Sequence, residues 1–167
     1  MASIFGKVLG LFVAATVFLA SSAPAQCGSY GLASGACAGS IALSCGGVPA
    51  IGNANFTLNL FGAPEKSAAF LLIDTATSSY VCGPPSCFGP TCPLRIHVPL
   101  PVLMFVGPVL TTPGACAGAA SWAIPIPPDQ ALVGTTTYAQ ALVLNPAGGC
   151  GVFPAWFDAT PGLSVSL

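Results

Sequence analysis

The residues of this chain that could do the most chemistry are its eight cysteines and its single histidine. Cys82, Cys87, Cys92 and His97 recur at intervals of five residues, and thiolates and imidazole are preferred zinc ligands. The spacing is not that of a usual zinc knuckle, however, and exported thiols meet an oxidising environment. We therefore expect disulfides and no cofactor, with a zinc site as the alternative. The candidate disulfide cysteines are Cys27, Cys37, Cys45, Cys82, Cys87, Cys92, Cys116 and Cys150.

Acid–base catalysis has few candidate residues. The whole chain holds four carboxylates, of which Asp74 and Asp158 could form a glycosidase pair. Asp74 is followed by the polar segment Thr75-Ala-Thr-Ser-Ser79, and Asp158 comes shortly before Thr160-Pro-Gly162. We therefore expect both to be turn residues. His97 alternates with Arg95, and we expect a surface or packed imidazole there and not a catalytic base. No nucleophile elbow, zinc-protease motif or phosphate loop is present, and the sequence therefore predicts a protein that is not an enzyme.

Aromatic side chains suggest a binding function instead. Trp156, Tyr80 and Tyr138 are the candidate ligand contacts, because aromatic faces stack on sugar rings without needing charge. Trp122 alternates with Ile124 in an apolar segment, so we expect it in the core. The pattern around Trp156 is compatible with either location.

Charge is scarce throughout the chain. After residue 25, the charged residues are Glu65, Lys66, Asp74, Arg95, Asp129 and Asp158. Nucleic acids and anionic membranes are bound through clusters of Lys and Arg, so neither is an expected partner. A surface that is nearly free of charge favours association with itself or with other surfaces.

The N-terminal residues are typical of a signal peptide. Lys7 precedes an apolar run from Val8 to Ala20, and Ala23-Pro-Ala25 fits the small-residue cleavage rule. We predict a signal peptide over residues 1–25 and a secreted or extracellular domain over residues 26–167. We do not expect the domain to be inserted in a membrane. The apolar run is shorter than the roughly 20 residues that span a bilayer.

The predicted domain is all-β, because proline and glycine interrupt every potential helix. Residues Asn55–Phe61 alternate polar with apolar side chains, as a half-buried strand does. The other predicted strands cover residues 40–45, 68–74, 94–98, 102–106, 119–126, 135–144 and 163–167. This number of short strands indicates a single two-sheet β-sandwich or jelly-roll-like domain, braced by disulfides.

Several short phrases resemble a bacterial secreted module of uncharacterised function, which occurs alone after a signal peptide or at the C-terminus of larger exported proteins. The phrases are Gly35-Ala-Cys37-Ala-Gly-Ser40, Gly47-Val-Pro-Ala-Ile-Gly-Asn53, Pro125-Ile-Pro-Pro-Asp-Gln-Ala-Leu-Val-Gly134 and Tyr138-Ala-Gln140. The resemblance implies a β-sandwich. It also implies a disulfide between Cys37 and Cys92, the positions where such modules usually carry cysteine.

We expect a non-catalytic structural, adhesive or interaction module of the cell surface or extracellular matrix. Its partner would be itself, a cell-envelope protein or a polysaccharide. Carbohydrate binding is the alternative function, and it requires Trp156, Tyr80 or Tyr138 exposed together on one face. An assembly module requires an exposed apolar or Thr-rich sheet face.

Overall fold

The computed structural model describes residues 25–65, 67–82, 94–99, 103–108, 116–145, 150–152 and 155–167. The predicted signal peptide therefore lies outside the described residues, apart from its last residue. Described residues form strands, one short 3-10 turn (η1, Gln130–Leu132) and loops, which confirms the all-β prediction. The strands are β1 (Gln26–Tyr30), β2 (Ala42–Gly46), β3 (Thr57–Ala63), β4 (Ala68–Asp74), β5 (Tyr80–Cys82), β6 (Leu94–Ile96), β7 (Leu103–Pro108), β8 (Gly118–Ala123), β9 (Thr136–Leu144), β10 (Cys150–Val152), β11 (Ala155–Ala159) and β12 (Gly162–Ser166).

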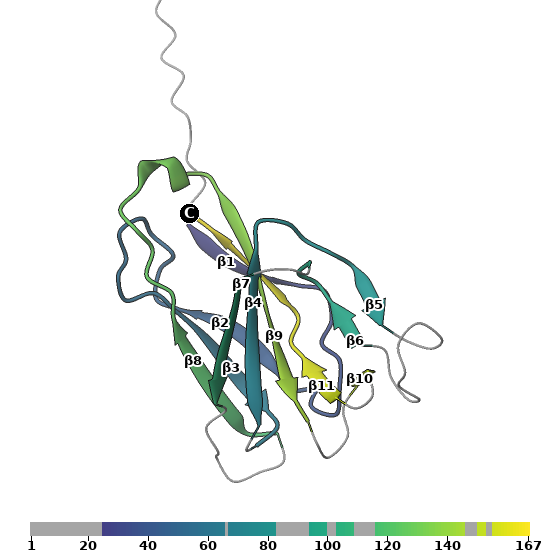
Figure 1. Ribbon diagram of the computed structural model, residues 1–167. Helices are drawn as coiled ribbons and strands as arrows, with labels where there is room; N and C mark the ends of the chain where they lie inside the picture. The colour runs from purple at the N-terminus through teal and green to yellow at the C-terminus, as the bar shows by residue number, and fades with distance from the viewer. Residues whose placement is uncertain are drawn as a thin grey trace, which may run out of the picture.

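Two antiparallel sheets form a β-sandwich, as predicted. In the large sheet, β9 pairs with β4 along one edge and with β12 and then β11 along the other. Strand β7 extends this sheet beyond β4, β1 extends it beyond β12, and β10 extends it beyond β11. The small sheet has the order β2-β3-β8. Figure 1 shows the small sheet on the left of the view and the β5–β6 pair on the right, with β4 and β9 between them.

The predicted alternation of β3 is confirmed. Leu58 and Leu60 are buried, whereas Thr57 and Asn59 on the opposite face are partly exposed. This pattern follows from the period of two in a strand, because one face of the small sheet packs against the large sheet and the other faces water.

The main core lies between the two sheets. It includes Phe56, Leu58 and Leu60 from the small sheet side and Leu71 and Val143 from the large sheet. Burying a side chain of this size contributes about 1.5–3 kcal/mol. Trp122 also belongs to this core, which confirms the prediction made from its alternation with Ile124.

A second, smaller core covers the outer face of the large sheet. Leu72 and Leu142 project from β4 and β9 and pack with Ile96, Val98 and Ala159. Strand β4 is therefore apolar on both faces, because the segment containing β6 covers the side turned away from the small sheet.

Gln140 attaches that covering segment to β9. Its side chain is fully buried, its Oε1 accepts the His97 N–H over 2.8 Å, and its Nε2 donates to the carbonyls of Arg95 and Thr160 over 2.9 Å each. The amide therefore supplies hydrogen bonds to backbone groups that no neighbouring strand satisfies.

The eight predicted strands all occur, with ends that differ by a few residues. The sequence missed β1, β5, β10 and β11. Strand β1 has no polar–apolar alternation, and its extended conformation is fixed by a five-residue antiparallel pairing with β12.

Among the residues whose side chains the structure describes, two disulfides brace the sandwich. Cys27–Cys45 joins β1 of the large sheet to β2 of the small sheet, and Cys37–Cys116 joins the loop after β1 to the residues just before β8. The predicted bond between Cys37 and Cys92 is thus wrong. The fold brings Cys116 within a Cα–Cα distance of 5.6 Å of Cys37, which is the usual separation for a disulfide.

Of the remaining cysteines, Cys82 and Cys150 lie in β5 and β10, where the structure describes the backbone. Cys87 and Cys92 lie outside the described residues. The two observed disulfides are typical of proteins that fold in an oxidising compartment.

The two disulfides predict a ranking of stability losses. Cys37–Cys116 closes a loop with a sequence separation of 79 and Cys27–Cys45 one of 18, so chain entropy predicts losses of about 4–5 and about 3 kcal/mol on removal. We expect Cys37→Ala with Cys116→Ala to lower the free energy of unfolding more than Cys27→Ala with Cys45→Ala, measured by urea denaturation. The opposite ranking would show that loop closure does not govern their contributions.

Candidate functional site

Asp158 lies in β11 and is fully buried. The backbone N–H groups of Ala36 and Cys37 donate to its two carboxylate oxygens over 2.7 and 3.3 Å, and Asn145 Nδ2 donates over 3.0 Å. Gly35 has a φ of +111°, and a Cβ at this position would overlap the carboxylate. The prediction that Asp158 is a turn residue is therefore wrong, because the loop after β1 folds over the side chain and uses it as an anchor.

Asp74 is a turn residue, as predicted. Its Oδ1 accepts the backbone N–H groups of Thr75 and Ala76 at the end of β4. Along β9, Asp74 is opposite Tyr138 and Asp158 is opposite Val143. Five residues of strand separate the two positions by about 17 Å, whereas glycosidase carboxylates are about 5–9.5 Å apart. The structure does not bring the two carboxylates together.

Tyr138, one of the three predicted ligand contacts, belongs to an aromatic cluster with Tyr30 and His97. The Tyr30 ring packs edge-on against Tyr138 and against His97, with centroid distances of 5.8 and 5.7 Å. The Tyr30 hydroxyl donates to the His97 carbonyl over 3.0 Å. The sequence did not single out Tyr30, because only the pairing of β1 with β12 and of β12 with β9 places it beside Tyr138.

The backbones of the other two predicted contacts lie in short strands. Tyr80 in β5 is opposite Ile96, and Trp156 in β11 is opposite Gly151. Their side chains lie outside what the structure describes. The predicted gathering of Trp156, Tyr80 and Tyr138 on one face therefore stays a prediction.

Beside the aromatic cluster is a hollow of about 420 Å³, which we call the tyrosine hollow. Its lining residues are Tyr30, Gly31, Thr77, Ser78, Ser79 and His97. Burial, with a smaller effect from nearby Tyr138, raises the pKa of Tyr30 to about 12, so its phenol remains a hydrogen-bond donor at physiological pH. His97 Nε2 lies 2.9 Å from the Leu32 carbonyl oxygen.

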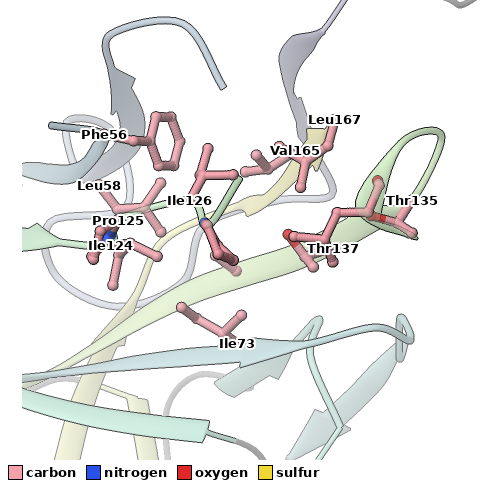
Figure 2. Close-up of a pocket in the computed structure, with 13 residues that line it drawn as sticks. Phe56, Leu58, Ile73, Ile124, Pro125, Ile126, Thr135, Thr137, Val165 and Leu167 are labelled. Carbon is pink, nitrogen blue, oxygen red and sulfur yellow. The ribbon is translucent and has the colours of Figure 1, made fainter. Parts of the chain in front are cut away.

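A second hollow, the end cavity, opens between the two sheets at one end of the sandwich (Figure 2). Its volume is about 210 Å³. Thr135 and Thr137 are the lining residues with polar side chains, and the Thr135 hydroxyl donates to the Leu132 carbonyl over 2.7 Å. The lining residues are Phe56, Leu58, Ile73, Ile124, Pro125, Ile126, Pro127, Leu132, Thr135, Thr137, Ala139, Val165 and Leu167.

The outer face of the small sheet, which we call the small-sheet face, carries no charged side chain on its three strands. Alternation and register place on it Ala42, Ser44, Gly46, Thr57, Asn59, Phe61, Ala119, Ser121 and Ala123. The Ser121 hydroxyl donates to Asn59 Oδ1 over 2.7 Å. Half of the Phe61 side chain is exposed, so one aromatic ring lies among small uncharged residues, directly opposite Ala42.

Within the described ranges, no three His, Cys, Asp or Glu side chains are close enough to hold a metal ion. The zinc alternative depends on Cys87 and Cys92, which these ranges do not include. Nor do the described residues contain a helix of the length and apolarity needed to cross a membrane.

No protein-family model, curated protein or solved structure matches this chain. The function must therefore be inferred from the geometry of the three surfaces described above.

Asp158 predicts a pH dependence of stability. Burial raises the pKa of its carboxyl, and the hydrogen bonds from Ala36, Asn145 and Cys37 offset this only in part. A raised folded-state pKa means that the folded protein binds the proton more tightly than the unfolded chain does. The contribution to stability is then present below the unfolded pKa of about 3.9 and is lost as the pH rises through the folded pKa.

We expect the urea midpoint of the wild type to rise as the pH is lowered through the folded pKa of Asp158 toward the unfolded value of about 3.9. The Asp158→Asn variant should lack this rise, because it has no proton to bind at this position. Asp74→Asn is the matched control and should keep it. A rise that persists in Asp158→Asn would assign the effect to another group.

Proposed function

We propose that this protein is a secreted, non-catalytic interaction module that serves as a structural or adhesive component of the cell surface or extracellular matrix. The observation that carries the proposal is the small-sheet face, a continuous three-stranded surface without charge. The two disulfides support the extracellular location, because such bonds persist in oxidising compartments.

The chemistry of the small-sheet face suits association with a second copy of the chain. Charge keeps most proteins apart in solution, and two copies of this face would meet without like-charge repulsion. Hydroxyl and amide groups such as those of Ser44, Asn59 and Ser121 can donate and accept in either direction. The half-exposed Phe61 ring adds apolar area that contact would remove from water.

The non-catalytic part of the proposal is supported by the engagement of the candidate acid–base groups. Asp158 is fully buried and accepts three hydrogen bonds, two of which hold the loop after β1. Asp74 holds a turn at the end of β4. The resemblance to an exported bacterial module, drawn from phrases such as Gly35-Ala-Cys37-Ala-Gly-Ser40, is part of the same proposal.

Polysaccharide binding is the second candidate function, and the tyrosine hollow favours it. The hollow combines the aromatic residues Tyr30 and His97 with three hydroxyl-bearing residues, Thr77, Ser78 and Ser79. The Ser78 hydroxyl donates to the Ile96 carbonyl. Aromatic faces and uncharged hydroxyls are the groups that bind neutral sugars, and the volume of about 420 Å³ falls in the range of ligand pockets.

Self-association through the small-sheet face predicts a specific effect of charge. Phe61→Lys places a positive charge on that face, so that two copies would repel each other, and we expect the variant to sediment as a monomer. Val133→Lys is the matched control, because Val133 has the same exposure of 50% and lies beyond the small sheet, next to η1. Assembly lost in both variants, or in neither, would contradict the assignment to this face.

Sugar binding at the tyrosine hollow predicts that filling it abolishes co-sedimentation with insoluble polysaccharide. Ser79→Trp should fill the hollow, whereas Ala76→Trp, at an exposed position of the same loop, should leave it open. We expect wild type and Ala76→Trp to pellet with the polysaccharide and Ser79→Trp to stay in the supernatant. A wild-type protein that stays in the supernatant would rule out this second candidate.

A further inference from the structure

The end cavity is a second binding feature of the fold, independent of the small-sheet face and the tyrosine hollow. It exists because the inward face of β9 carries small side chains at this end of the sandwich. Thr135, Thr137 and Ala139 follow one another with the period of two, opposite the larger Phe56 and Leu58. Sheets pack about 10 Å apart, so small residues in one layer leave space that the other layer does not fill.

One rim of the end cavity is held open by hydrogen bonds and prolines. Ile124 N–H donates to the Phe56 carbonyl over 2.9 Å, and Ile126 N–H donates to the Asn53 carbonyl over 3.0 Å. Pro125 and Pro127 alternate with these residues and fix the backbone angle φ. This rim is therefore bound to the small sheet and its preceding loop, and cannot fold inward without breaking those bonds.

The opposite rim is fixed in the same way. Gly134 N–H donates to the Leu167 carbonyl over 2.8 Å, and Leu167 N–H donates to the Thr135 carbonyl over 3.0 Å. Figure 2 shows Val165 and Leu167 with Thr135 and Thr137 across the cavity from Phe56 and Ile124, and Ile73 along a further side. With both rims fixed, the space is preformed.

The volume and lining identify the ligand class. At about 210 Å³, the end cavity exceeds the engineered apolar cavity of about 150 Å³ that stays dry and binds benzene. No charged side chain is among its lining residues, so an ionised ligand would lose its hydration without gaining a partner. The hydroxyls of Thr135 and Thr137 are the polar side-chain groups of the lining.

We propose that the end cavity binds the alkyl chain of a neutral amphiphile. The chain enters between the sheets and contacts Phe56, Ile73 and Val165, while the uncharged head group lies in the mouth of the cavity, where the apolar rim removes part of its water. Such a site would let the module hold a lipid-like molecule in addition to any contact made by the small-sheet face.

The first experiment titrates the oxidised protein with straight-chain primary alcohols from butanol to decanol, followed by NMR shifts of the isoleucine methyl groups. Affinity should increase about fourfold for each added methylene until the chain outgrows the cavity, with the largest shifts at Ile73 and Ile124. Octanoate and octylamine should bind at least about tenfold more weakly than octanol, because the cavity offers no counter-charge. Benzene binding without alcohol binding, or equal binding of octanoate, would overturn the proposal.

Two substitutions at one position locate the site. Thr137→Leu extends the side chain into the cavity and should weaken octanol binding roughly tenfold, since it occupies the space of about two methylenes. Thr137→Val keeps the shape of threonine and should bind octanol as the wild type does. Thr136→Leu introduces the same leucine on the opposite face of β9 and is the matched control.

Each outcome of these variants bears on the proposal. Weak binding by Thr137→Leu alone would support it. Equal affinities in Thr137→Leu and Thr136→Leu would show that the alcohol binds elsewhere. Thermal unfolding of each variant provides the check that the sandwich is intact, and if Thr137→Leu fails to fold, the wild-type methyl shifts at Ile73 and Ile124 still locate the alcohol.

Discussion

Strand β9 is the element on which the rest of the structure depends, because both its edges and both its faces are used. Its edges pair with β4 on one side and with β12 and β11 on the other. Its inward residues join the core between the sheets, and its outward residues Gln140 and Leu142 hold the segment that contains β6. The aromatic cluster beside the tyrosine hollow uses Tyr138 on one face of this strand, and the end cavity uses Thr137 and Ala139 on the other.

The parts of the fold that the sequence predicted are those governed by local burial. The strands around Leu58 and Leu71 could be predicted because the positions that face the core carry apolar side chains. Strand β11 was missed because Asp158 resembles a turn residue in sequence, and nothing local reveals that Ala36 and Cys37 would donate to it across more than 120 residues. The Cys37–Cys116 disulfide was missed for the same reason, since the partner of a cysteine is decided by tertiary structure.

The candidate sites show the same division. Tyr138 was recognised from its residue type, but its neighbour Tyr30 was not, because their contact is made by strand register. The end cavity has no sequence motif at all. Only the relation between small residues on β9 and larger ones on β3 produces it. With so few charges available, buried polar contacts in this chain are made mainly by amides, hydroxyls and backbone groups, and these leave little signature in a sequence.

The position of β1 has a consequence for how the chain is made. Its described sheet partner is β12, so more than 130 residues separate the two strands along the sequence, and long-range pairing of this kind is slow. During synthesis, β1 would wait for more than 130 further residues to emerge before it could pair with β12. The Cys27–Cys45 disulfide spans only 18 residues and needs no C-terminal strand. We therefore expect oxidation of this pair to precede completion of the large sheet, holding the N-terminal strand beside β2 until β12 arrives.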